Sequence, residues 1–180
     1  STSTANNKVN VTTPGSAVQL VALEGGGKVT GDHDGISFYY VELDPTKDNF
    51  ELSATIKVSA YAKDPHDGQE SFGIMARDAI GTTGDSTVFA SNIAAIGGYS
   101  GGTTKQNGTQ LFVRTGITSP DGAGSLGVQS KMLEPVKPTA ITTASNYKLT
   151  LIKTNSGFSG RLNNGTTESF FVPDIMKVQD

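Results

Sequence analysis

The sequence contains no cysteine and no tryptophan, and it has only two histidines, His33 and His66. The lack of cysteine excludes disulfides and thiolate metal sites. Two histidines, separated by a turn-rich stretch and a long strand pattern, are poor zinc ligands and leave few groups for acid–base catalysis. The lack of tryptophan removes the usual flat platform on which crystalline glucans stack.

The chain also lacks an excess of basic charge and lacks long apolar runs. Its net charge is −3 and its pI is about 5.3. Because a nucleic-acid binder needs a basic surface, this balance argues against such a partner. No apolar run approaches membrane-spanning length, and no basic-then-apolar signal segment opens the chain. We therefore expect neither nucleic acid nor a membrane as a partner.

Small and hydroxyl-bearing residues are abundant instead. The 180 residues include 22 glycines, 22 threonines and 17 serines, and only 17% of them are charged. This length suits one domain with a single core. The composition is typical of β-sheet surfaces outside the cell rather than of helical cytosolic enzymes. It favours a secreted or cell-surface protein.

Alternating apolar and polar residues predict an all-β fold. The clearest segment is Phe50–Ala62, where Phe50, Leu52 and Ile56 alternate with polar residues, as in a half-buried strand. Asn-Ser-Gly at 155–157 and Asn-Asn-Gly at 163–165 are hairpin turn signals between the last three strands. Further strands are expected at 17–24, 36–43, 71–80, 87–99, 110–115, 147–154, 158–162 and 168–172.

This spacing of strands, with no helical period, predicts an antiparallel β-sandwich. Residues 1–10 read as a linker or N-terminal arm, and residues 11–180 read as one sandwich domain. The turn-rich stretch Gly116–Ile141 is expected to wrap a sheet edge. One core should bury the following side chains: Phe50, Leu52, Ile56, Val58, Phe72, Ile74, Leu149 and Leu151.

Two motifs that suggest catalysis fail on their context. Residues 98–102 fit the pattern G-x-S-x-G, but the residues after them will not start the helix that a nucleophile elbow needs. Glu42-Leu43-Asp44 resembles the start of a paired-carboxylate strand, but Pro45 ends that strand. No catalytic residue is predicted.

A turn at residues 31–35 gathers Asp32 and Asp34 between two glycines. Carboxylate oxygens on a loop suit calcium, so the two aspartates are candidate ligands of a structural calcium ion. The alternative is a polar turn whose aspartates cap backbone amides.

Several segments of the chain belong to one recognisable pattern. They are GGGKVTGDHDGISFYYVELDPTKDNFELSATIKV, QESFGIMARDAIG, SNIAAIGGYSGG, LFVRTG, NYKLTLIKTNSGFSGRLNN and ESFFVPD. This series resembles an accessory β-sandwich module of secreted bacterial pectate lyases and related polysaccharide-degrading proteins. The phrase FGIMARD, followed by SN and a glycine-rich turn, is the most specific part. The resemblance runs from about Gly25 to the C-terminus.

The resemblance implies a concanavalin-like jelly roll that binds carbohydrate and does not catalyse. Its implied partners are a polysaccharide, pectin-like or another plant polymer, and a neighbouring catalytic domain of the same bacterial protein. Modules of this type are expected to have one more strand after the segment PDI…VQD. The sandwich is therefore expected to lack a closing strand.

The candidate binding residues follow from alternation on two strands. Met75 and Arg77 share one face of the strand at 71–80, and Phe112 and Arg114 share the exposed face if Leu111 points into the core. Placed on neighbouring strands, two apolar–arginine pairs suit an acidic sugar, because guanidinium groups bind carboxylates through two hydrogen bonds.

Tyr99 and Asn92 flank the same region and complete the candidate site by stacking or hydrogen bonding. In the alternative interpretation Arg77 only pairs with an acid such as Asp78 or Asp85. A structural or adhesive module that orders a neighbouring catalytic domain is the second functional hypothesis. An enzyme, such as a lyase that uses Arg or Lys with calcium, is the third.

Overall fold

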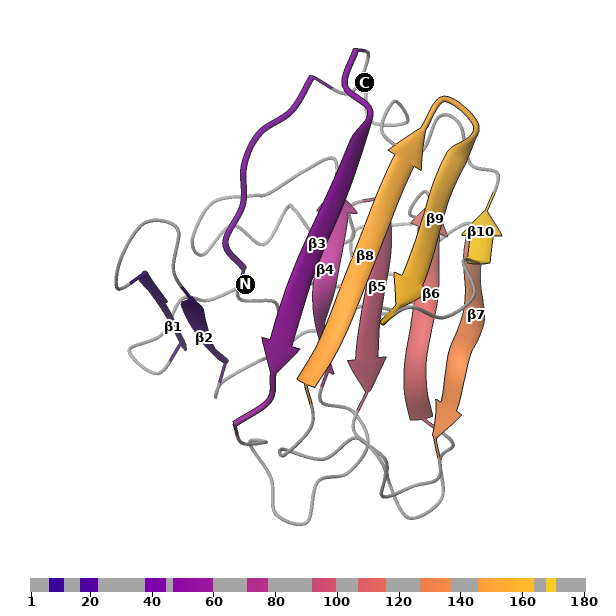
Figure 1. Cartoon of the computed structure of the whole chain (residues 1–180). Coiled ribbons are helices and arrows are strands. Elements are labelled where there is room, and N and C mark those ends of the chain that lie inside the picture. Colours follow the sequence, from indigo (N-terminus) through magenta and orange to yellow (C-terminus); the bar gives the residue numbers. More distant parts are fainter. Residues whose placement is uncertain are drawn as a thin grey trace, which may run out of the picture.

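The computed structural model contains β-strands and no helix in the part that it describes (Figure 1). It describes residues 7–11, 17–22, 38–44, 47–59, 71–77, 92–99, 107–115, 127–136, 146–163 and 168–170. The strands are β1 (Asn7–Val11), β2 (Val18–Ala22), β3 (Phe50–Lys57), β4 (Ser71–Arg77), β5 (Ile93–Tyr99), β6 (Asn107–Thr115), β7 (Gly127–Val136), β8 (Asn146–Thr154), β9 (Gly157–Leu162) and β10 (Glu168–Phe170).

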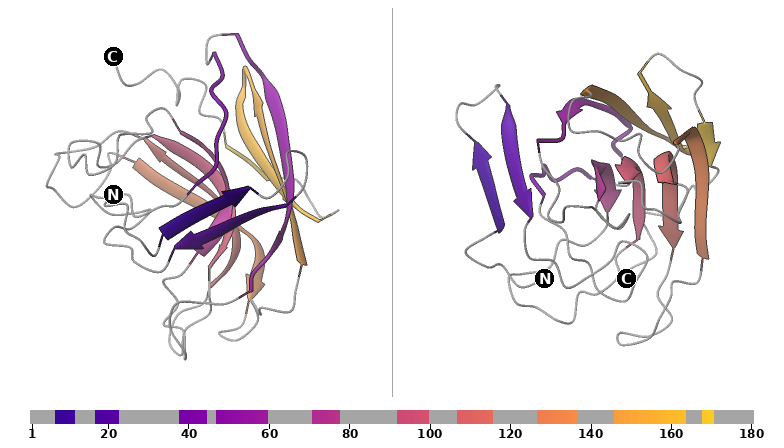
Figure 2. Two further views of the ribbon diagram at one scale, coloured as in Figure 1. Left: turned by 90° about the vertical axis from the view of Figure 1, so that its left-hand side faces the viewer. Right: turned by 90° about the horizontal axis from the view of Figure 1, so that it is seen from below.

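Two four-stranded sheets form the body of the domain, and β1 and β2 form a separate two-stranded ribbon. One sheet has the order β10-β9-β8-β3 and the other has the order β4-β5-β6-β7. Every strand pair is antiparallel. Figure 2 shows the two sheets as separate layers. The predicted antiparallel sandwich is therefore confirmed, and the jelly-roll connectivity stays a prediction.

The predicted β8–β9 turn and the first residue of the predicted turn after β9 have backbone conformations that their sequences favour. Thr154 faces Gly157 across the β8–β9 turn, and Gly157 has a φ of 125°, which glycine accepts without strain. Asn163, directly after β9, has a φ of 51°, a region that asparagine tolerates better than most residues. Its backbone N–H donates to the carbonyl of Lys148 (2.7 Å), and its Oδ1 accepts from the Lys148 N–H (3.2 Å).

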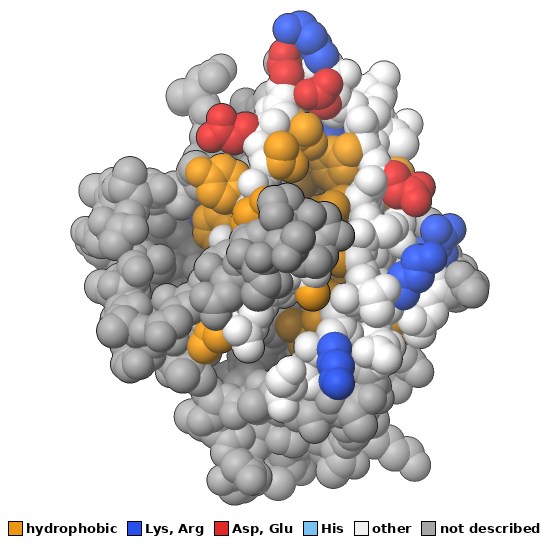
Figure 3. Space-filling view, turned by 60° about the vertical axis from the view of Figure 1, so that its left-hand side comes forward, with side chains coloured by type: hydrophobic (Ala, Val, Ile, Leu, Met, Phe, Trp, Pro, Cys, Tyr) orange, Lys and Arg blue, Asp and Glu red, His pale blue; other side chains and the backbone are white. Residues whose placement is uncertain are grey.

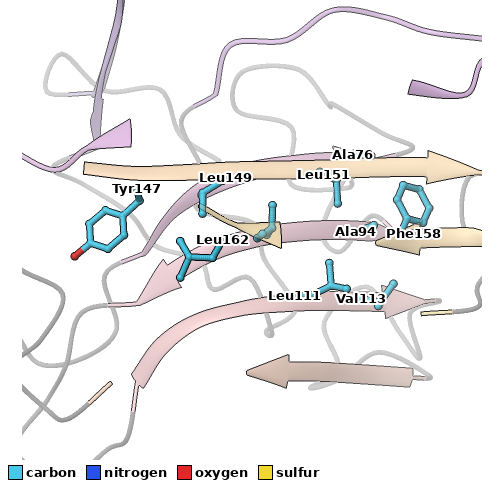
Figure 4. Close-up of a cluster of buried hydrophobic side chains, with 10 residues drawn as sticks. Ala76, Ala94, Leu111, Val113, Tyr147, Leu149, Leu151, Phe158 and Leu162 are labelled. Carbon is cyan, nitrogen blue, oxygen red and sulfur yellow. The ribbon is translucent and has the colours of Figure 1, made fainter. Parts of the chain in front are cut away.

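The core lies between the two sheets (Figure 4). Ala94, Ile96 and Leu111 from one sheet and Leu149 and Leu151 from the other are completely buried. The other buried members of this cluster are Ala76, Val113, Tyr147, Phe158 and Leu162. Two aromatic pairs pack at the ends of this core. The ring centroids of Phe50 and Phe158 lie 6.4 Å apart, and those of Phe72 and Tyr147 lie 5.1 Å apart.

Most of the predicted core is confirmed. Leu149 and Leu151 are completely buried, Val58 is buried, and Phe50, Ile56, Phe72 and Ile74 pack against the cluster. Leu52 is the exception, because it remains 41% exposed. It faces Leu151 across the β3–β8 ladder, but β3 is the last strand of its sheet. The prediction that Leu52 is buried was wrong because edge position, not alternation, sets its exposure.

Three other segments differ from the sequence expectation. Residues 38–44, part of the strand expected at 36–43, lie outside any strand. β7 lies within Gly116–Ile141, the turn-rich stretch that was expected to wrap a sheet edge. It is an edge strand, which explains why it tolerates Pro135. β1 includes residues 7–10 of the expected arm and pairs with β2.

Candidate functional site

The predicted arginine pairs lie on the sheet β4-β5-β6-β7. Met75 is opposite Ala95, which is opposite Phe112. One row further on, Arg77 is opposite Ile93, which is opposite Arg114. The register therefore aligns the two pairs across the sheet. They are not on neighbouring strands as expected, because β5 lies between them, and two strand spacings separate their backbones by about 10 Å.

Burial removes two of the predicted residues from the surface. Phe112 is only 4% exposed, so the predicted exposure of its ring was wrong. Its neighbours Leu111 and Val113 are buried as well, which means that both faces of β6 are covered at this point. Asn92 directly precedes β5 and is 1% exposed, so its side chain is also an interior group. Met75 is half-buried.

The remaining predicted residues are located only in part. Arg114 and Tyr99 are placed by their strands, with Tyr99 opposite Ser71, but their side chains lie outside the described part of the structure. Asp32 and Asp34 lie outside the described residues altogether. Their roles in binding sugar and calcium stay predictions.

Arg77 has an aromatic contact that the sequence did not indicate. Its guanidinium carbon lies 5.3 Å from the centroid of the Phe38 ring. Phe38 in turn lies 5.6 Å from Tyr40, with the rings tilted by 57°. We call residues 38–40 the aromatic segment. Its exposed rings are Tyr39 (64%) and Tyr40 (52%), which are amphipathic surfaces suited to stacking on a sugar.

Other large apolar side chains are exposed as well. Val41, Leu43 and Leu52 are exposed in addition to the two tyrosines. Figure 3 shows hydrophobic side chains gathered in the upper and central part of this face, with acidic side chains around their upper rim. Large exposed apolar groups that cluster in this way commonly mark a contact surface.

The outer face of the other sheet is polar. Exposed Ser53, Thr55 and Lys57 on β3 alternate with the inward-facing residues. On β8, Lys148 is exposed, whereas Thr150 on the same face is completely buried and its hydroxyl shares a 2.8 Å hydrogen bond with that of Ser53. Hydroxyl and cationic groups on one open sheet face can bind hydroxyl and carboxylate groups of a polymer.

The two aspartates directly before β3 make local contacts within the turn. Asp48 accepts a hydrogen bond from the Asp44 N–H (2.8 Å), and Lys47 forms an ion pair with Asp44 (2.7 Å). Both contacts stabilise the turn before β3, so Asp44 has a structural role in the turn. Within the described residues, no three or more His, Cys, Asp or Glu side chains are grouped so that they would hold a metal ion.

The described strands form a two-layer antiparallel sandwich. The family model of the pectate disaccharide-lyase N-terminal domain matches residues 1–180, so the chain belongs to that family. This membership confirms the resemblance to an accessory module of pectate lyases.

Two relatives contain a region similar to this chain. The chain is 65% identical over 182 residues to Pectate lyase L of Thermoclostridium stercorarium, with all of this chain aligned to 14% of that protein. It is 26% identical over 170 residues to the pectate disaccharide-lyase of Dickeya chrysanthemi. This alignment covers 86% of this chain and 21% of that protein. No solved structure matches the chain significantly.

The chain thus spans only a small part of the relatives it matches. It corresponds to an N-terminal domain and not to the catalytic part of a pectate lyase. This agrees with the expectation that the domain alone is not an enzyme. Among the described residues, no helix has the length and hydropathy needed to cross a membrane.

Proposed function

We propose that the domain is a non-catalytic carbohydrate-binding module that holds pectin-like polysaccharide near the catalytic domain of a secreted bacterial lyase. The observation that carries this proposal is the family itself, because the domain occurs at the N-terminus of pectate disaccharide-lyases. A module that binds the polymer raises its effective concentration at the catalytic domain without adding chemistry.

The surface of the domain supports this role. Tyr39 and Tyr40 are exposed aromatic rings, and the outer face of β3 and β8 is lined by hydroxyl and lysine side chains. A pectic polymer carries hydroxyl and carboxylate groups along its whole length. An open face suits an extended polymer of this kind better than a closed pocket does.

Affinity electrophoresis of the purified domain tests the proposal. Polygalacturonate, pectin, xylan and levan are embedded in separate gels. We expect retardation by the pectic polymers. The absence of retardation on all four gels would contradict carbohydrate binding. Unsaturated products released from polygalacturonate by the domain alone would instead show that it is an enzyme.

The predicted arginine pair can be examined by the same measurement. Arg77→Ala and Arg114→Ala are expected to lower affinity for the acidic polymer while the circular dichroism spectrum stays unchanged. The contact between Arg77 and Phe38 gives an alternative outcome, in which Arg77→Ala lowers stability rather than affinity. Equal affinity of both variants and the parent would remove this pair from the binding site.

Structural calcium is a separate part of the proposal. Asp32 and Asp34 are the proposed ligands, supported by their position in the sequence between Gly31 and Gly35, a pattern that favours a turn. If the ion binds only the folded state, calcium raises the melting temperature and EDTA lowers it. The double variant Asp32→Asn/Asp34→Asn should abolish this difference. Equal melting temperatures of the parent with calcium and with EDTA would contradict the site.

A spacer that orders the neighbouring catalytic domain is the second candidate function. It is favoured by the exposed apolar side chains Val41 (77%), Leu43 (48%) and Leu52 (41%). In this case the double variant Val41→Ser/Leu43→Ser lowers the melting temperature of the catalytic domain in the full-length protein. The isolated domain then binds none of the four polymers.

A further inference from the structure

Three cations form a straight line across the outer face of the sheet β10-β9-β8-β3. Lys57 on β3 is opposite Asn146, and Lys148 lies two residues further along β8. Arg161 on β9 is opposite Thr150, again two residues beyond Lys148. Each step is one strand over and two residues along. We call Lys57, Lys148 and Arg161 the cation diagonal.

The register fixes the spacing of the cation diagonal. Diagonal neighbours on one face of an antiparallel sheet lie about 7–8 Å apart. The three residues share the outer face, because the intervening Leu149 and Leu162 point into the core. In Figure 1, β3, β8 and β9 form the front layer, and no other described strand crosses in front of them. Lys57 and Lys148 are exposed on this face, and Arg161 is half-buried.

Hydroxyl groups border the cation diagonal on one side. Thr55 is opposite Lys148, and Ser53 and Thr150 lie in the row of Arg161. Glu51 is the only acid on this face in the described part of β3, β8 and β9, and it lies opposite Ile152, beyond the row of Arg161. The face therefore combines positive charge with hydroxyl hydrogen-bonding groups, although the chain as a whole has a net charge of −3.

The three cations of the cation diagonal are not neutralised by acidic side chains within the described structure. Lys57 and Lys148 are exposed, and neither they nor Arg161 form an ion pair with another described residue. Arg161 is half-buried, and its Nε is a buried donor without a hydrogen-bond partner in the described part of the chain. Burial of Nε fixes the plane of the guanidinium, so less orientational freedom is lost when its outer nitrogens bind a carboxylate.

We propose that the cation diagonal binds carboxylates of an unesterified polygalacturonate chain that crosses β3, β8 and β9 obliquely. This inference rests on the proposed function and adds the site and the charge state of the ligand. Arg161 binds one carboxylate through its planar fork, and Lys148 and Lys57 bind others as point charges. The exposed hydroxyls of Ser53 and Thr55 bond sugar hydroxyls. Methyl esters remove the charge that this site recognises.

The experiment uses the whole domain and three soluble polymers: polygalacturonate, highly methyl-esterified pectin and neutral galactan. The test variants are Lys57→Gln and the double variant Lys148→Gln/Arg161→Gln. Lys47→Gln is the matched control, because Lys47 is a 79% exposed lysine in the turn before β3, at the opposite end of that strand from Lys57. Titration calorimetry gives the affinities, and circular dichroism confirms the fold.

We expect the parent to prefer polygalacturonate and to lose affinity as salt rises, because salt screens exposed charges. The affinity of the double variant for polygalacturonate should fall by about tenfold or more, and its binding of the neutral polymer should be unchanged. Lys57→Gln should weaken it in the same direction, and Lys47→Gln should match the parent. Lys57→Gln keeps the test valid if the double variant unfolds, because Lys57 is exposed and pairs with no described residue.

Two results would overturn the cation diagonal while leaving the proposed function intact. One is parental affinity for polygalacturonate in both Lys57→Gln and the double variant. The other is equal binding of polygalacturonate and esterified pectin by the parent. If the parent binds none of the polymers, the proposed function itself fails.

Discussion

The guanidinium carbon of Arg77 on β4 lies 5.3 Å from the centroid of the Phe38 ring, which belongs to a segment outside the strands. A cation over an aromatic face is typically worth about 0.5–2 kcal/mol, depending on its exposure. This contact attaches the aromatic segment to the outer side of β4.

The contact can be measured with a double-mutant cycle of Arg77→Leu and Phe38→Leu in urea unfolding. We expect a coupling free energy of about 0.5–2 kcal/mol in favour of the native pair. The leucine variants keep apolar bulk at both positions, so the coupling reports the interaction of the charge with the ring. A coupling near zero would mean that the two groups are adjacent without stabilising each other.

Leu151 and Leu52 provide a matched pair on opposite strands of one ladder. Leu151 is completely buried, and Leu52 directly opposite is 41% exposed. Leu151→Ala should lower the free energy of unfolding by about 2–5 kcal/mol, because it leaves a cavity in the core. Leu52→Ala should cost about 1 kcal/mol or less. Equal losses in chemical denaturation would show that the β3 edge is buried in solution.

Gly160 faces the core from β9 where the other sheet approaches closely. A Cβ at this position would lie 3.0 Å from Leu111 Cδ1 and 3.2 Å from Ile96 Cδ1. Gly160→Ala should therefore destabilise the domain by about 1–3 kcal/mol through overpacking. Ser159→Ala, one residue away on the outer face, is the control. A stabilised Gly160→Ala variant would show that the side chains of Leu111 and Ile96 move aside freely.

Two fully buried threonines differ in whether their hydroxyls are bonded. Thr150 shares a 2.8 Å hydrogen bond with Ser53, whereas Thr109 Oγ1 has no hydrogen-bond partner in the described structure. Thr109→Val should be neutral or stabilising, because it removes a buried polar group that gains nothing. Thr150→Val should cost about 0.5–1.5 kcal/mol. Thermal unfolding of both variants distinguishes them, and the reverse order would contradict this assignment.

Alternation and turn residues were sufficient to predict β3, β8 and β9. Their apolar residues recur at every second position, and the turns between β8 and β9 and after β9 carry Gly157 and Asn163, which accept positive φ values. β7 was missed because glycine and proline surround it, and because its pairing with β6 depends on tertiary structure that the local sequence does not encode. The exposure of Leu52 was mispredicted for the same reason, since alternation says nothing about which strand forms the edge.

The candidate site shows the same limit. Sequence alternation correctly separated Leu111 and Val113 from Phe112, but it could not indicate that Phe112 is buried on the opposite face. The sequence analysis did not identify the cation diagonal, because Lys57 and Arg161 are far apart in the chain and only the β3–β8–β9 register brings them onto one line. A search for cations at matched alternation on predicted strands would have raised them as candidates.

The pairing of β3 with β8 has a consequence for how the domain is made. Ser53 and Thr150 are hydrogen-bonded although they are 97 positions apart, whereas β4, β5 and β6 each pair with the next strand along the chain. Closing so long a loop carries a large entropic cost, so the local meander is expected to form first and folding is slow. During translation β3 emerges early and waits for β8 with an unsatisfied backbone edge. A ribosome stalled before residue 146 therefore holds a chain that is open to aggregation and cannot complete its second sheet.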